Sequence, residues 1–96
     1  MKIHTIRLGE PWERTLLMDG RTRHRRRFGR PRTLDADERL WLVCDQPRSV
    51  TVNGTELDTA ERFDITGLLQ SRNELVIDMR ADEPLGAITL EVWSNK

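Results

Sequence analysis

Apolar residues recur at every second position through much of the sequence, and this spacing limits the fold more than any other feature. In the segment ELVIDMR, Leu75, Ile77 and Met79 fall on one side of an extended chain, and AITLEVW, residues 87–93, repeats the alternation. Successive side chains of a strand point to opposite faces, so both segments are predicted to be strands with one buried face. No window shows an apolar stripe at helical spacing, and the sequence therefore predicts an all-β chain.

The other strands are short apolar runs between turn-forming residues. The predicted strands cover residues 2–8, 12–17, 22–28, 40–45, 49–52, 55–57, 74–80 and 87–93. The predicted turns, which contain glycine, proline or both, lie at residues 9–11, 19–20, 29–31, 46–47, 53–54 and 83–86. Short strands separated by such turns favour a β-sandwich or a barrel.

Two local signals refine this outline. Asn53-Gly54 lies between SVTV and TEL, and both residues tolerate positive φ, so a tight hairpin turn is predicted there. The segment FDITGLL breaks the alternation, and its residues Asp64 and Thr66 can cap a helical turn. One short helix or 3₁₀ turn is predicted over the end of the sandwich.

The run LWLVC, residues 40–44, is apolar on both sides, which predicts a central strand covered above and below. Trp41 is accordingly predicted to be structural, and Cys44 to be a small core residue rather than a nucleophile. Because Cys44 is the single cysteine, an internal disulfide and a cysteine-based metal cluster are both excluded.

Length and charge set further bounds. A chain of 96 residues forms one domain, so residues 1–96 are predicted to be a single unit. The net charge is zero, but residues 1–32 carry ten basic and three acidic side chains, whereas residues 33–96 carry six basic and thirteen acidic ones. The two parts can neutralise each other, and arginine, which supplies most of the positive charge, pairs with carboxylates and with other anions.

The arginine-rich stretch RTRHRRRFGRP, residues 21–31, is predicted to be largely strand. Its odd-numbered side is a row of guanidinium groups formed by Arg21, Arg23, Arg25 and Arg27. We interpret this row either as a solvated face paired with acids of neighbouring strands, such as Asp78 or Glu91, or as an anion-binding face for phosphate, sulfate or uronate groups. A nucleic-acid partner is disfavoured, because the stretch lacks lysine and has few aromatics to stack on bases.

The order of the motifs resembles a known family. VTVNGTELD, FDITGLL, RNELVIDM and a closing ITLEVW follow one another as in the sugar-binding, N-terminal jelly-roll domain of glycoside hydrolase family 2, the β-galactosidase and β-glucuronidase group. The upstream HRRRFGRPRTLDADERLWLVCD is similar to that family's arginine-rich strand and central hydrophobic strand. The resemblance covers about residues 22–93.

The resemblance implies a galactose-binding-like β-sandwich, a jelly roll of two antiparallel sheets with one short helical turn. Two departures limit what it implies for function. Only residues 55–62 stand where the family has a long loop that reaches toward its catalytic barrel, and the sequence contains no barrel to supply catalytic carboxylates. We therefore expect no catalytic residues and no enzymatic activity.

Candidate ligand-binding residues are few. Trp12 and Trp93 are candidate platforms for stacking on a sugar ring, and the row of Arg21, Arg23, Arg25 and Arg27 is the candidate polar site. His4 and His24 lack partners at metal-ligand spacing, so neither a metal site nor a cofactor is expected.

The sequence favours a non-catalytic jelly-roll module that binds a carbohydrate or a protein partner. The alternative is a structural or interaction protein that associates through edge strands or charged faces, and a remoter one is an accessory domain of a glycoside hydrolase system. Oligomeric state stays open. No signal peptide or transmembrane segment is recognisable, so a cytoplasmic location without membrane contact is expected.

Overall fold

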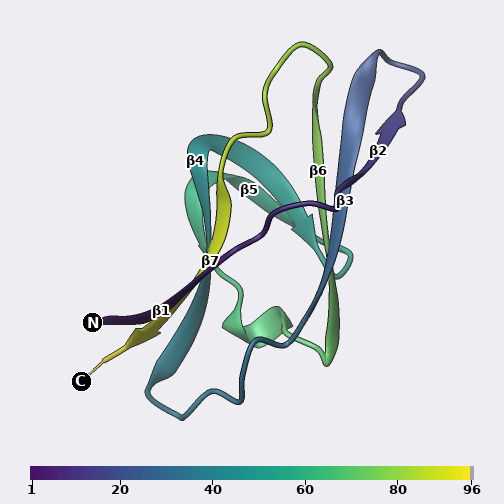
Figure 1. The fold of residues 1–96 in the computed structure, drawn as a ribbon. Helices are drawn as coiled ribbons and strands as arrows, with labels where there is room; N and C mark the ends of the chain where they lie inside the picture. Colours follow the sequence, from purple (N-terminus) through teal and green to yellow (C-terminus); the bar gives the residue numbers. More distant parts are fainter. Residues whose placement is uncertain (96) are drawn as a thin grey trace.

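The computed structural model describes residues 1–95, and the statements below concern those residues. It is an all-β fold with one 3₁₀ turn, as the alternation predicts (Figure 1). The elements are β1 (Lys2–Arg7), β2 (Glu13–Leu16), β3 (Arg21–Gly29), β4 (Glu38–Val52), β5 (Thr55–Asp64), η1 (Thr66–Leu68), β6 (Arg72–Arg80) and β7 (Ile88–Ser94). The arginine-rich stretch is a regular strand, β3.

All strand pairs are antiparallel and form one curled sheet in the order β1-β7-β4-β6-β3-β2, with β5 paired to β4. The long strand β4 joins the two halves, because its residues 38–44 pair with β7 while Thr51 and Val52 pair with β6. Figure 1 shows β4 and β5 arcing together from the β1–β7 side toward the β3–β6 side, with η1 between the two sides at the lower end. The division into two separate sheets stays a prediction.

Two predicted boundaries are wrong. Residues 40–45 and 49–52 belong to one strand, β4, which continues through Gln46 and Pro47. The pairing of β4 with β5 shifts register on both sides of Arg48, so Pro47 lies at an irregularity where proline is tolerated in a strand. The strand predicted at residues 55–57 is also longer than expected, since β5 continues to Asp64.

The apolar core lies inside the curl and draws on both halves of the sheet. The side chains that are almost completely buried are Leu40, Leu42, Val50, Val52, Ile65, Leu75, Ile77, Ile88, Leu90 and Val92. Apart from Ile65, which lies between β5 and η1, they occupy alternate positions of β4, β6 and β7, which is the pattern that predicted these strands. Cys44 is buried among them, as expected, and burial raises the pKa of its thiol to about 11.

The described residues contain no helix of the length and apolarity that crossing a bilayer requires.

Candidate ligand-binding site

A hollow of about 460 Å³ lies on the face of β3 and β6 that points away from the core. Its lining comes from four strands and consists of Arg21, Arg23, Arg25, Ser49, Thr51, Glu56, Glu74, Val76 and Asp78. Val76 is the one apolar side chain in this set. The lining is therefore almost entirely made of hydrogen-bonding and charged groups.

Strand register explains why these side chains meet. In β6 the buried residues Leu75, Ile77 and Met79 alternate with side chains that face outward. Arg23 pairs with Asp78 and Arg25 with Val76, so the odd-numbered arginines of β3 share the outward face. Pairing of Thr51 with Val76 brings the outward side of β4 beside them, and Glu56 follows from the pairing of β5 with β4.

The best-defined polar contact in the hollow joins Arg23 and Asp78. Arg23 Nε donates to Asp78 Oδ1 at 2.8 Å, and a terminal nitrogen of Arg23 donates to Oδ2 at 2.9 Å. These hydrogen bonds lower the pKa of Asp78 and raise that of Arg23. Asp78 is thus held ionised at neutral pH, where it accepts hydrogen bonds and does not serve as an acid.

Arg25 and Arg27 make looser ion pairs than Arg23, whereas Arg21 pairs closely with an acid of the preceding turn. Arg25 Nε lies 3.5 Å and Arg27 Nε 3.6 Å from the same carboxylate oxygen of Glu74, and both arginines lie 3.9 Å from Glu13. Arg25 Nε is buried without a hydrogen-bond partner, because its contact with Glu74 is an ion pair with no hydrogen-bond geometry. Arg21 pairs with Asp19 at 2.8 Å.

The interpretation of the row as a face paired with acids of neighbouring strands is confirmed for Arg23 and Asp78, and anion binding stays a prediction. The row is ion-paired with acids of neighbouring strands, including Asp78, and it also lines a concave surface. Glu91, the other expected acid, instead lies 3.8 Å from Lys2 and accepts a hydrogen bond from the indole of Trp93.

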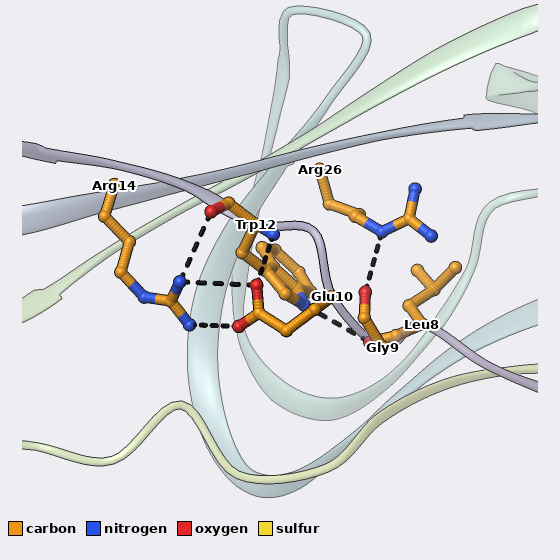
Figure 2. Close-up of polar contacts among 6 residues, drawn as sticks. All are labelled: Leu8, Gly9, Glu10, Trp12, Arg14 and Arg26. Atoms are coloured by element: carbon orange, nitrogen blue, oxygen red, sulfur yellow. Dashed lines mark hydrogen bonds and ion pairs between the residues drawn. The ribbon is translucent and has the colours of Figure 1, made fainter.

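Trp12 is a core residue rather than a surface platform. Only 7% of its surface is exposed, and its indole nitrogen donates to the carbonyl of Leu8 at 3.3 Å (Figure 2). Its backbone N–H donates to Glu10, which also pairs with Arg14. Because its ring is packed in the core, Trp12 does not belong to the outer-face hollow.

Trp93 lies on a different part of the outer surface. Trp41 and Trp93 are half-buried, and the guanidinium carbon of Arg62 lies 5.0 Å and 5.2 Å from their ring centroids. β4 is a central strand, as predicted, but only alternate residues of 40–44 face the core, so Trp41 is half-buried rather than fully covered. Arg62 on β5 engages both rings, so neither ring is a bare stacking surface.

The residues that carried the family resemblance have structural contacts. The Asn53 amide donates to the carbonyl of Leu68 and to Asn73 Oδ1, and Asn53 Oδ1 accepts from the backbone N–H of Glu74. Asn73 is buried and bonds to the backbone of Gln70. These hydrogen bonds connect the β4–β5 turn to η1 and to the start of β6.

The FDIT motif likewise stabilises the fold. Asp64 Oδ1 accepts hydrogen bonds from the backbone and hydroxyl of Thr66, and the Thr66 hydroxyl accepts from the backbone N–H of Leu40. Burial raises the pKa of Asp64, but the bonds from Thr66 and Arg39 outweigh it and lower the pKa overall. The two expected capping residues thus hydrogen-bond to each other.

Sequence reasoning found the arginine row and Asp78 but missed most other residues of the hollow. No local sequence pattern indicates that Ser49, Thr51 and Glu56 belong to the site, because they reach the hollow only through the curl of β4 and β5. Within residues 1–95, no group of three or more His, Cys, Asp or Glu side chains is arranged to hold a metal ion.

A comparison with protein-family models gives no match, and a comparison with curated proteins gives none either.

Proposed function

We propose that the chain is a non-catalytic, galactose-binding-like jelly-roll module that binds a carbohydrate in the outer-face hollow. The observation that carries this proposal is the hollow itself. It has a volume of about 460 Å³ and is lined by arginine, carboxylate and hydroxyl groups. Sugar hydroxyls both donate and accept hydrogen bonds, so they need both kinds of partner. Binding pockets use a few such fixed polar groups to orient a ligand.

The contacts within the hollow suit this role. Arginine has five N–H donors, and Arg23 uses two of them on Asp78, so further donors remain for a ligand. The pairing also fixes the guanidinium before a ligand arrives, which lowers the entropy cost of binding. Two features support the jelly-roll assignment. The motif order resembles that of the family 2 sugar-binding domain, and β4, with β5 beside it, links the two halves of the sheet.

Calorimetry with a panel of galactosides, glucuronides and sulfated glycans tests the proposal. The variant D78N removes the charge that orients Arg23, and we expect it to weaken binding of every ligand by roughly tenfold or more, since bonds to charged groups are each worth about 1.5–3 kcal/mol. The matched control is D82N, because Asp82 pairs with an arginine, Arg80, but does not line the hollow.

If D82N binds with wild-type affinity and D78N binds more weakly, the result supports the outer-face hollow as the binding site. Absence of binding to the whole panel, or equal binding by D78N and wild type, contradicts it.

A second candidate function is protein interaction through an edge strand. It is favoured by Leu16 and Met18, which are 72% and 109% exposed on the hairpin of the edge strand β2. Exposed apolar groups beside an unpaired strand edge are a typical contact surface. Sedimentation at low and high salt discriminates: a monomer at all salt concentrations removes self-association, whereas a concentration-dependent dimer supports it.

A further inference from the structure

Beyond the main hollow, the surface continues toward the end of β3 and the start of β6. Two further hollows of about 440 and 410 Å³ lie there, and both are lined by Arg27, Arg72 and Asn73. The second of them also shares Glu74 with the main hollow. The hollow of 410 Å³ thus adjoins the main hollow at Glu74, and it adjoins the hollow of 440 Å³ at Arg27, Arg72 and Asn73, where the β3–β6 strand pair ends.

Charge is uneven along this face. Among residues 1–95, no carboxylate forms an ion pair with Arg72, and Arg27 is 68% exposed with its nearest carboxylate oxygen 3.6 Å away. Of the carboxylates in the described part of the chain, only Glu13 and Glu74 pair with Arg25 and Arg27, so these two arginines and Arg72 face two acids at this end. One positive charge is left unpaired.

The opposite end of the same face differs. There Arg80 lies 3.2 Å from Asp82 and 3.9 Å from Glu83, and Arg21 lies 2.8 Å from Asp19. Each arginine at that end has its own acid. The unpaired charge is therefore specific to the Arg27 and Arg72 end.

The local geometry leaves room for a ligand group. Arg27 pairs with Glu74 and Gly29 with Arg72, so Arg27 and Arg72 are diagonal neighbours on the same face, roughly 7–8 Å apart at their backbones. Gly29 has no side chain, and a Cβ placed there would meet only the carbonyl of Ser71 at 3.9 Å. Two guanidinium groups at this spacing can reach one anion from two sides.

From this we propose that Arg27 and Arg72 form an anion subsite, which makes the ligand of the module an acidic carbohydrate bearing a carboxylate or sulfate group. The inference rests on the proposed function, since the main hollow holds the sugar and the subsite holds its charged group. Planar, bidentate pairing of guanidinium with carboxylate or sulfate oxygens supplies the selectivity.

The test compares methyl galactoside, methyl glucuronide and a sulfated methyl galactoside by calorimetry at low salt. We expect the wild-type protein to bind one or both acidic ligands about tenfold more tightly than the neutral one, as one charge-assisted contact provides. The glucuronide and the sulfated sugar distinguish a carboxylate from a sulfate as the group bound.

The variant R72Q is expected to remove the preference and to leave affinity for the neutral sugar within about twofold, because Arg72 does not line the main hollow. The control R80Q, on the same strand at the ion-paired end, is expected to keep the preference. A preference that persists in R72Q, or equal affinities of the wild-type protein for all three sugars, overturns the subsite.

The neutral sugar separates the two proposals. If it binds and D78N abolishes its binding while no charge preference exists, the proposed function stands and the subsite is wrong. If none of the three sugars binds, both are wrong.

Discussion

At the scale of single residues, asparagine side chains decide the geometry of the turn beside the site. Asn53 has φ of +50°, a conformation that side chains other than asparagine, aspartate and glycine rarely adopt. Its side chain also makes three hydrogen bonds, to Leu68, Asn73 and Glu74. Backbone conformation explains only part of its presence, and the side-chain bonds explain the rest.

Substitution of Asn53 separates the two effects. In N53G the backbone conformation is kept and the side-chain bonds are lost, so we expect the free energy of unfolding to fall by about 1–3 kcal/mol. In N53A the same bonds are lost and positive φ becomes unfavourable, which adds roughly 1–2 kcal/mol. Urea unfolding measures both. Equal stability of N53G and wild type would show that the side-chain bonds contribute nothing.

His24 is the buried titratable residue of β3. It is 6% exposed, and its Nδ1 has no hydrogen-bond partner. Burial lowers its pKa, and the positive charges of Arg14 and Arg48 lower it further, against the opposing effect of Asp78 and Glu10. The folded protein therefore favours the neutral imidazole.

The pH dependence of stability follows from that shift. The unfolded chain takes up a proton as pH falls through about 6.5, whereas folded His24, with its lowered pKa, takes one up only at lower pH, so the free energy of unfolding falls with pH in that range. Unfolding in urea between about pH 7.5 and about pH 5 should show a shallower decline for H24Q than for wild type. H4Q, which makes the same substitution at the exposed histidine of β1, is the control variant. If the free energy of unfolding depends on pH in the same way for H24Q and wild type, His24 is not the source of the decline.

At the scale of elements, alternation in the sequence was enough to predict most strands, but not the extent of β4 and β5. A proline often ends a strand, but Pro47 lies where the hydrogen-bonded pairing of β4 with β5 is interrupted. A local pattern does not distinguish such an irregularity from a strand end. The half-buried position of Trp41 is hard to predict for a related reason, because Arg62, which lies over its ring, comes from another strand.

The candidate site was predictable to the extent that it lies on one strand pair. The outward side of β3 follows from alternation alone, whereas Asp78 was one of two acids expected to pair with it, and the β3–β6 register decides between them. The contributions of Ser49, Thr51 and Glu56 depend on how β4 curls between β7 and β6, which is a long-range property. Burial of Trp12 depends in the same way on packing between distant segments.

At the scale of the whole molecule, the charge division along the sequence is partly neutralised inside the fold. The basic strand β3 lies beside β6, whose Asp78 and Glu74 pair with its arginines. The curl then places hydroxyl and carboxylate groups of β4 and β5 on the same face. The pairing leaves this face concave and polar while the apolar side chains fill the interior.

Chemical-shift mapping of backbone amides, with the saccharide that binds most tightly by calorimetry, locates the ligand directly. The proposed function predicts that the shifts which change on titration cluster at Arg23, Thr51 and Asp78. Changes confined to Trp41, Arg62 and Trp93, or no changes at any ligand concentration, would show that the outer-face hollow is not the binding site.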